Sequence, residues 1–432
     1  MSDQGAENSL HYLLSVITEN YNKMKLTSLL RLHSFKSLYN QSFILQIFIS
    51  EILYTCAHIF SILFKIFPIN DKKIVFCNFN GKGYADNPKY IAEELFRQNK
   101  HADYVWLIKN TEDSSSIPSY MRIVDVDSIK AIYEYATARI WINNFGIPLY
   151  IHKRRKQIYI DTWHGSALKK IGADAIEGSL PSLTTLSLKK RARETDLLLT
   201  NSRLQDEIYR RAFLYEKEYL KVGTPRNDIL ASNDLSRKEK IWAKLESTYN
   251  IKRNQNILLY APTFRKDLNL TYYTLDLTKC LLALTKRFGG DWIVFLRLHP
   301  IISHKSHEVI NSSTTSIYDV SAYADMQELL CISDVLITDY SSSMFDFCLT
   351  KKPCFLYVPD LDAYDKNDRG FYTDPRSLPF SLCLDMNELI KCIINFDDMR
   401  YKQQVTDFLT TSGDYNEGHA AKEVVNWLYR RL

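Results

Sequence analysis

Two histidines that directly follow runs of β-forming residues are the side chains best suited to proton transfer in this chain. His164 comes just after residues 157–161, and His299 ends the run 292–299. An imidazole with a pKa near 6.5 can accept a proton from an attacking hydroxyl at cellular pH. His164 could instead be structural, because a histidine beside a tryptophan, here Trp163, often only fills space.

Cationic and hydroxyl side chains accompany both histidines and suit a phosphate ligand. Arg297 lies two positions before His299, which places both on one face of the expected strand. A guanidinium can grip phosphate oxygens with two parallel hydrogen bonds. The alternative for Arg297 is an edge-strand arginine that pairs with a carboxylate.

Gly165 permits a close backbone approach beside His164. Lys169 and Lys170 follow at an expected helix start, where cations and unpaired N–H groups favour an anion.

A third candidate element is the apolar run 335–338, which leads through hydroxyl-bearing residues into an expected helix. Thr338, Ser341 and Ser342 would lie near that helix N-terminus, where free N–H groups and the helix dipole attract phosphate. Helix capping explains one serine, but less easily the whole set. Asp339 could accept a hydrogen bond from a ribose hydroxyl or hold a catalytic group.

Signatures of other chemistries are missing from the sequence. It contains no Walker G-x-x-x-x-G-K-[ST], no G-x-G-x-x-G after a strand and no H-E-x-x-H. Two D-x-D pairs, at residues 125–127 and 360–362, are of a kind that recurs by chance, and basic residues could neutralise a diphosphate alone. We therefore expect no metal and no cofactor.

Composition predicts a folded protein of two domains. The 432 residues exceed what one core usually serves, and 46% are hydrophobic. A net charge of +5 does not require nucleic acid as a partner, and the basic run 153–156 can be read as a solvated loop. Eight cysteines without a C-x-x-C pair are expected to be buried thiols in a reducing, cytoplasmic compartment.

The first strongly apolar stretch, residues 42–67, predicts an amphipathic helix. Gln46, Glu51, His58 and Lys65 interrupt it, which disfavours a membrane span, and no secretory signal precedes it. One face of the expected helix would bear apolar residues: Leu45, Phe48, Ile49, Ile52, Cys56, Ile59 and Leu63. Upstream Lys23, Lys25, Arg31 and Lys36 could meet anionic headgroups. The helix could instead pack on the protein's own core.

Beyond Pro68 the chain alternates short β-rich runs with helical stretches, which predicts an α/β fold with parallel sheets. The first half has expected strands at 74–79, 104–108, 139–143, 157–162 and 196–201. The second half has them at 256–261, 292–298, 316–320, 335–338 and 354–358. A polar stretch at 223–254 separates the halves. Ligands of such sheets bind beyond the carboxyl ends of the strands, where the residues above lie.

Seven strings in order resemble the CDP-glycerol glycerophosphotransferase family, the teichoic-acid primases and polymerases and their capsule-making relatives. They are NGK with DNPKY (80–90), WHGSALKKIG (163–172), GTPRND (223–228), YAPTFR (260–265), LRLHP (296–300), SDVLITDYSSSMFDF (333–347) and KKPCFLYVPDLDAY with RGFY (351–372). The resemblance covers about 70% of the chain. One departure is Ser166-Ala167, where similar proteins usually have Thr-Pro. The missing proline would loosen this turn.

The resemblance implies a GT-B architecture, with two Rossmann-like domains facing a cleft and an N-terminal helical leader. It implies that His164 activates an acceptor hydroxyl and that His299 serves the donor diphosphate, with release of CMP. The implied donor-binding residues are Arg297, Thr338, Asp339, Ser341, Ser342 and Arg265. The implied residues for the acceptor or its phosphate are Gly165, Ser166, Lys169, Arg226 and Asn227.

With the resemblance, the domains are expected as a membrane-associating leader (1–70), an acceptor domain (71–225), a CDP-donor domain (250–410) and a C-terminal helix (411–432) that packs back on the N-terminal domain. The expected partners are CDP-glycerol or a similar CDP-polyol, a lipid-linked or polymeric acceptor, and the cytoplasmic membrane surface. Two other functions stay open: a GT-B glycosyltransferase that uses a sugar nucleotide, and a membrane-bound scaffold without turnover.

Overall fold

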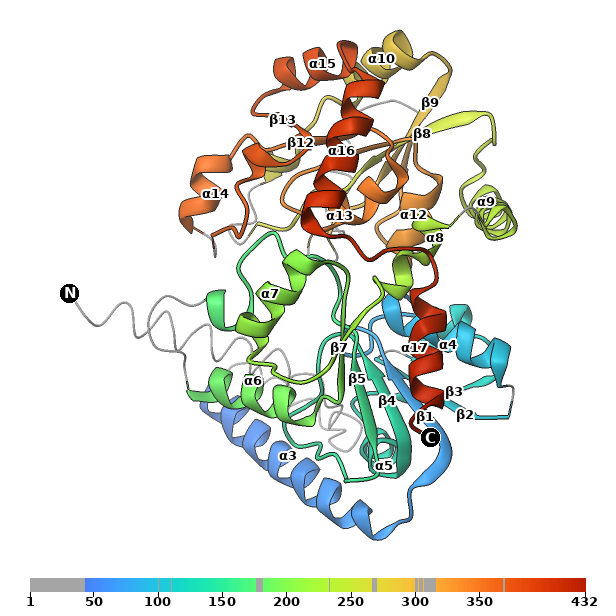
Figure 1. Ribbon diagram of the computed structural model, residues 1–432, viewed down its shortest axis with the longest axis vertical. Coiled ribbons are helices and arrows are strands. Elements are labelled where there is room, and N and C mark those ends of the chain that lie inside the picture. The colour runs from blue at the N-terminus through green and yellow to red at the C-terminus, as the bar shows by residue number, and fades with distance from the viewer. Residues whose placement is uncertain are drawn as a thin grey trace, which may run out of the picture. The chain divides into compact units, whose positions relative to one another are not determined.

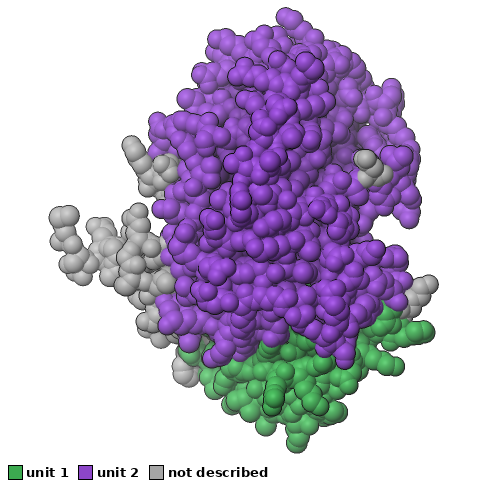
Figure 2. Space-filling model, in the orientation of Figure 1, with its two compact units in different colours: residues 1–84, 99–160 green, residues 85–98, 161–432 purple. Residues whose placement is uncertain are grey.

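The structure, a computed structural model, describes residues 43–432 apart from 100, 110, 176–181, 233, 266–269, 300–301, 303–305, 307–315 and 368–369. It divides into two compact units, which Figure 2 colours separately. Unit 1 comprises residues 1–84 and 99–160, and unit 2 comprises residues 85–98 and 161–432. The leader residues Lys23, Lys25, Arg31 and Lys36 lie outside the described part.

Unit 1 is built on parallel strands that follow one another in the order β3-β2-β1-β4-β5. These are β1 (Asn70–Cys77), β2 (Asp103–Ile108), β3 (Met121–Asp125), β4 (Ala138–Asn143) and β5 (Ile158–Asp161). Its helices are α3 (Phe43–Leu63) and α5 (Ile129–Thr137), with short 3-10 turns η2 (Phe64–Ile66) and η3 (Thr111–Ser116). The order of the strands reverses between β1 and β4, which pair in parallel with Val75 opposite Trp141.

Unit 2 contains a six-stranded sheet in the order β10-β9-β8-β11-β12-β13. Its strands are β8 (Gln255–Tyr260), β9 (Asp291–Leu296), β10 (Ile317–Asp319), β11 (Val335–Thr338), β12 (Cys354–Tyr357) and β13 (Ser381–Cys383), all paired in parallel. The chain therefore winds outward from β8, returns to β11 and winds the other way, which is the doubly wound arrangement of Rossmann-like sheets. The prediction of an α/β fold with two parallel, Rossmann-like sheets, as in the GT-B type, is confirmed.

Unit 2 also contains helices, 3-10 turns and the strands β6 and β7, several of which are labelled in Figure 1. The first part has α4 (Asp86–Gln98), η4 (Gly172–Ala175), α6 (Ser182–Glu194), β6 (Leu197–Thr200), α7 (Arg203–Phe213), β7 (Tyr219–Lys221), η5 (Pro225–Asn227), α8 (Asp228–Ala231) and α9 (Leu235–Tyr249). The second part has η6 (Leu270–Tyr273), α10 (Leu277–Phe288), α12 (Met326–Ile332), α13 (Ser343–Phe347), η8 (Cys348–Thr350), α14 (Leu361–Asn367), η9 (Pro375–Ser377), α15 (Met386–Ile394), α16 (Asp398–Ser412) and α17 (Ala420–Tyr429).

Strand residues on both faces of the second sheet are buried, as expected for a parallel sheet covered by helices. Leu258, Val294 and Leu336 have no exposed surface. Helices α10 and α15 pack against each other, and the C-terminal helix α17 lies beside α4 (Figure 1). Helices from early and late in the chain are thus neighbours in unit 2.

Helix α3 confirms the predicted helix over much of residues 42–67, and it packs on α5 of unit 1. Leu53, Ala57 and Ser61 are the buried residues of its described side chains. The predicted apolar face, represented by Ile52, Cys56, Ile59 and Leu63, is instead exposed. The side chains of Leu45, Phe48 and Ile49 lie outside the described residues. None of the helices in the described part is both long and apolar enough to cross a bilayer.

The cysteines are all free thiols, and most of them are buried as predicted. Burial raises the pKa of the Cys77 and Cys280 thiols to about 12, which makes these groups unreactive. Cys56, on the exposed face of α3, is the exception to the predicted burial, and Cys392 is half-buried.

Candidate active site

The carboxyl ends of β8 and β11 meet where the strand order of the second sheet reverses, the place at which open α/β sheets bind ligands. Thr338 Oγ1 donates a hydrogen bond to the Ala261 carbonyl (2.7 Å), and the Ala261 N–H donates to Ile337 (3.0 Å). The Thr338 hydroxyl proton is therefore used to join the two strand ends. The Asp339 carboxylate accepts hydrogen bonds from the Thr263 N–H (2.9 Å) and hydroxyl (2.8 Å).

Arg265 is the centre of a buried ionic cluster at this strand end. Its guanidinium donates to Asp339 (2.7 Å) and to both oxygens of Asp360 (2.7 and 3.1 Å). Burial works to lower the pKa of Arg265, but Asp339 and Asp360 outweigh it and hold that pKa above its ordinary value. Because Tyr340 also donates to Asp360 (3.0 Å), the cluster fixes the start of the 340–343 loop.

Arg297 and His299 follow the end of β9 rather than lying within the strand. Arg297 Nη1 donates to the carbonyls of Tyr323 (2.5 Å) and Val320 (3.3 Å). In the described part of the chain its guanidinium pairs with no carboxylate, and burial lowers its pKa. The His299 ring lies 5.4 Å from the ring of Phe264, centroid to centroid, and Phe264 immediately precedes Arg265.

Ser341, Ser342 and Ser343 form the turn that leads into α13, which confirms the predicted strand, loop and helix sequence. Ser342 is the N-cap residue of α13, but its side chain makes no capping hydrogen bond. Ser341 Oγ accepts from the Ser343 hydroxyl (2.9 Å) and N–H (3.3 Å). The loop is thus shaped by its own serines.

The loop that carries His164 begins at Asp161, the last residue of β5. Trp163 has a φ of 50°, a left-handed conformation that is strained for a bulky residue. Its indole packs on Phe213 (ring centroids 4.5 Å apart) and under the Arg191 guanidinium (4.9 Å). The backbone N–H of Trp163 donates to the Asp161 carboxylate (3.1 Å), so both the side chain and the backbone of this strained residue are held in place.

Gly165 brings this loop next to the serine loop. A Cβ atom at Gly165 would lie 2.6 Å from Arg226 Nη2 and 3.2 Å from Ser342 Oγ. Only glycine allows that approach, and its φ of 133° also favours glycine. The Gly165 carbonyl accepts from Tyr209 Oη (2.9 Å), which joins the loop to helix α7.

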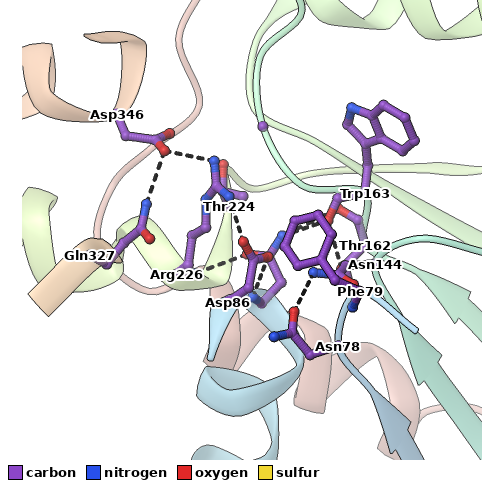
Figure 3. A network of polar contacts seen from close by, with 12 residues as sticks. Asn78, Phe79, Asp86, Asn144, Thr162, Trp163, Thr224, Arg226, Gln327 and Asp346 are labelled. Atoms are coloured by element: carbon purple, nitrogen blue, oxygen red, sulfur yellow. Dashed lines mark hydrogen bonds and ion pairs between the residues drawn. The ribbon is translucent and has the colours of Figure 1, made fainter. Parts of the chain in front are cut away.

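Arg226 lies in a buried network beside Gly165 (Figure 3). Its guanidinium donates to Asp86 (2.6 Å) and to Asp346 (2.6 Å), and Gln327 Nε2 also donates to Asp346 (2.9 Å). Asn227 Nδ2 donates to the other Asp346 oxygen (2.8 Å). Burial raises the pKa of the Asp346 carboxyl, and Arg226 opposes that rise. Arg226 and Asn227 therefore bind protein carboxylates here, and their role toward a substrate stays a prediction.

Lys169 and Ser166 are also held by neighbouring side chains. Ser166 Oγ accepts a hydrogen bond from Asn201 Nδ2 (2.8 Å). Lys169 forms an antiparallel bridge with Phe371, and its Nζ donates to Tyr364 Oη (3.1 Å). The expected helix after Lys170 is only the 3-10 turn η4. The Tyr364 ring also lies 4.9 Å from the Arg265 guanidinium carbon, so one tyrosine contacts both a predicted acceptor residue and a predicted donor residue.

The structure therefore brings residues predicted for the acceptor close to residues predicted for the donor, inside unit 2. Gly165 approaches Ser342, and Lys169 is linked to Arg265 through Tyr364. His299 connects to the same region through Phe264. Asp86, Asn87 and Asp346 lie within the strings that carry the resemblance but were given no role, and Gln327 lies outside them; their side chains hold these loops together.

The D-x-D pair at residues 360–362 is engaged by basic and hydroxyl side chains of the protein. Asp360 is paired with Arg265 and Tyr340, and Asp362 accepts from Arg376 (3.0 Å). Among the described residues, no three His, Cys, Asp or Glu side chains are grouped so that they could hold a metal ion.

Two parallel Rossmann-like sheets, with basic and hydroxyl side chains at a strand-order reversal, define an α/β protein of the kind that binds nucleotides. A family model described as CDP-Glycerol:Poly(glycerophosphate) glycerophosphotransferase matches residues 59–430. The chain belongs to this family, and the family and enzyme class predicted from the seven strings are confirmed.

Relatives and a solved structure agree with this membership. A teichoic acid poly(glycerol phosphate) polymerase of Bacillus spizizenii is 34% identical over 388 residues, which cover 86% of this chain and 96% of the relative. One of Staphylococcus epidermidis is 33% identical over 374 residues, and this chain spans 51% of its length. A histidine-to-asparagine variant of the wall teichoic acid polymerase TagF, soaked with CDPG, matches with a TM-score of 0.74 and 30% identity, covering 87% of this chain and 93% of that one.

Proposed function

We propose that this protein transfers glycerol phosphate, or a related polyol phosphate, from CDP-glycerol to a hydroxyl of a lipid-linked or polymeric cell-surface acceptor. The observation that carries the proposal is the approach of the His164 loop to the serine loop, with a Cβ at Gly165 only 3.2 Å from Ser342 Oγ. A proton acceptor and a phosphate-binding loop are thereby neighbours. Glycerol is favoured because both polymerases described above are named for poly(glycerol phosphate).

In the proposed reaction His164 takes the proton of the acceptor hydroxyl, whose oxygen attacks the phosphorus that bears glycerol. A new P–O bond forms, the P–O bond to CMP breaks, and CMP leaves with the electron pair. Arg297 and His299 serve the donor diphosphate. The half-buried guanidinium of Arg297, which has no carboxylate partner in the described part of the chain, would gain from an anion, since burial disfavours its charge.

Ser341 and Ser342 would add hydroxyl donors to the diphosphate at the N-terminal end of α13. Arg265 and Asp339 would hold the donor loop in shape, as their mutual ion pair suggests. Gly165, Ser166, Lys169, Arg226 and Asn227 remain our candidates for the acceptor side.

The test is a donor panel with purified protein and a lipid-linked acceptor, with products read by mass. We expect CMP release and growth of the acceptor by glycerol phosphate units with CDP-glycerol. Release of UDP from a UDP-sugar, with a sugar added instead, would favour the glycosyltransferase alternative. No turnover with any donor would favour the scaffold. The same masses report whether one unit or many are added.

We also propose that the protein works at the cytoplasmic face of the membrane as a peripheral protein. The exposed apolar residues of α3 and η2, namely Ile52, Ile59, Ile62, Leu63 and Ile66, support this placement. The basic run 153–156 lies at the same end of unit 1, because Arg154 donates to the Phe67 carbonyl (2.7 Å). Arg155 and Lys156 are exposed there and would favour anionic headgroups.

A further inference from the structure

The His164 loop requires support, because its backbone is unusual on both sides of the histidine. Trp163 has a φ of 50° and Gly165 has a φ of 133°. A left-handed tryptophan is held in place only where its surroundings fix it. The Trp163 carbonyl belongs to the peptide group that joins Trp163 to His164. A group that binds this carbonyl therefore also fixes the orientation of the His164 backbone, and with it the direction in which the imidazole leaves the chain.

Asn87, in the first turn of α4, supplies that contact. Its side chain has no exposed surface. Asn87 Nδ2 donates to the Trp163 carbonyl (3.0 Å) and, at longer range, to the Thr162 carbonyl (3.4 Å). Its Oδ1 accepts from the Arg226 N–H (3.0 Å). One amide group thus uses both its donor and its acceptor to join two loops.

The loop that carries Arg226 is in turn bound to α13, the helix that follows the serine loop. Arg226 pairs with Asp346, and Asp346 lies in α13 directly after the serine loop. Asp86 accepts from Arg226 (2.6 Å) and from the Asn87 N–H (2.7 Å), which closes the network on α4. The chain of contacts therefore runs from the His164 backbone through Asn87 and Arg226 to the helix that follows Ser341 and Ser342.

We infer that Asn87 is a positioning residue, which aligns His164 with the donor loop by holding the Trp163 carbonyl and the Arg226 amide together. The inference rests on the proposed function, since it assigns Asn87 a role in the step that His164 performs. An amide fits this task because it presents a donor and an acceptor side by side. A carboxylate of the same shape would keep the bond from Arg226 but would place an oxygen against two carbonyl oxygens.

The test measures transfer by Asn87→Ser with CDP-glycerol and the lipid-linked acceptor. We expect kcat to fall by about ten- to a hundredfold, as for a catalytic group that is displaced by a fraction of an ångström to 1 Å. The Kd for CDP-glycerol should change by no more than about twofold, because Asn87 does not contact the serines. An unchanged kcat, or a Kd that rises as much as kcat falls, would overturn the inference.

A double-mutant comparison separates positioning from general destabilisation. If Asn87 acts through His164, Asn87→Ser should cause no further loss in a His164→Ala background. Losses that multiply would contradict it. Asn143→Ser is the matched control, since Asn143 is also buried and also donates to a backbone carbonyl, that of Gly146 (3.2 Å) in unit 1. Any loss it causes should multiply with His164→Ala.

Asn87→Asp provides a second route if Asn87→Ser does not fold. It retains an oxygen for the Arg226 N–H and replaces the donation to Trp163 and Thr162 by an oxygen that faces their carbonyls. It should show the same lack of further loss with His164→Ala. If His164→Ala itself keeps full turnover, the proposed function fails; if His164→Ala is strongly slowed and the losses multiply in its residual turnover, only the role of Asn87 fails.

Discussion

At the level of single residues, hydrogen bonds hold the turn after His164, where similar proteins usually have a proline. The sequence predicted a looser turn because Ser166-Ala167 stands where similar proteins usually have Thr-Pro. The structure instead shows the Ala167 N–H donating to Gln205 Oε1 (3.0 Å), a bond that proline cannot make. Asn201 Nδ2 also donates to Ser166 Oγ (2.8 Å). Two hydrogen bonds therefore hold the turn that lacks the proline.

This compensation predicts coupling between positions 167 and 205. Ala167→Pro should leave the buried Gln205 oxygen without its donor, which costs about 1–3 kcal/mol of stability. Adding Gln205→Ala to Ala167→Pro should then cost less than Gln205→Ala costs alone. Urea unfolding of the four proteins measures the coupling, expected at about 1 kcal/mol. Strictly additive losses would show that the Ala167–Gln205 bond contributes nothing.

The same scale marks the limit of what the sequence could reveal about the site. Histidines, arginines and serines at strand ends could be found because strand ends are recognisable. Asp86, Asn87 and Asp346 lie within the quoted strings, but their roles could not be found, because their partner Arg226 is more than a hundred positions from all three and such side chains are common everywhere. Gly165 was predicted to allow close approach, but only coordinates reveal that Ser342 and Arg226 fill the space.

At the scale of elements, every inner strand and the edge strand β10 were predictable, and the other edge strands of the two described sheets were not. Each of the ten expected strands corresponds to a strand of the structure, with shifts at the ends; the predicted 292–298 is β9 (Asp291–Leu296). The strands β3, β7 and β13 were missed. β7 and β13 have only three residues each, Tyr-Leu-Lys and Ser-Leu-Cys, most of them half-buried or exposed. Such segments become strands because a neighbouring strand offers an edge, which their own residues do not encode.

Helix α3 makes a prediction that belongs to this scale. Ile52, Ile59, Ile62 and Leu63 of α3 are exposed while Leu53 and Ala57 are buried, so the exposed apolar residues should enter a lipid interface. Ile59→Asp with Ile62→Asp should lower binding to anionic vesicles by at least about tenfold, since each carboxylate would have to leave water. Cosedimentation with phosphatidylglycerol vesicles measures the change.

Leu235→Asp is the control for α3, because Leu235 at the start of α9 is an equally apolar and 72% exposed residue. It should bind vesicles like the unaltered protein. Equal binding by all of these proteins would contradict the role of α3, and an equal loss with neutral phosphatidylcholine vesicles would show that the apolar contact acts without help from anionic headgroups.

At the scale of the whole molecule, the C-terminal residues complete unit 2. Helix α17 packs beside α4, and its first N–H groups, those of Ala420 and Ala421, donate to the Asp228 carboxylate (both 2.8 Å). Trp427 Nε1 donates to Glu218 (3.0 Å) near the other end of the helix. Because α4 presents Asn87 to the His164 loop, the docking of α17 supports the element that holds the site. The domain boundaries expected from the sequence stay predictions.

Asp228 gives this docking a dependence on pH. Burial raises the pKa of Asp228 from 3.8 to about 6. The folded state then binds the proton more tightly than the unfolded chain, so the favourable contribution is complete below about pH 4 and is lost as the pH rises through about 6. Thermal unfolding between pH 4 and 7 should therefore show a fall in stability that Asp228→Asn removes.

Asp397→Asn is the control for that experiment, since Asp397 is an exposed cap of α16 that accepts from the Arg400 N–H (3.0 Å). It should keep the slope of the unaltered protein. A slope that persists in Asp228→Asn would contradict the assignment to Asp228.

The rate of CMP release from CDP-glycerol, in the presence of a lipid-linked acceptor, tests the proposed roles of His164 and His299 directly. His164→Ala and His299→Ala should each lower this rate by at least about a hundredfold, as expected when an acid, a base or a major electrostatic group is lost. His101→Ala, which changes an exposed histidine of unit 1, should release CMP at the unaltered rate. Rates in His164→Ala and His299→Ala that equal the rate in His101→Ala would contradict the account.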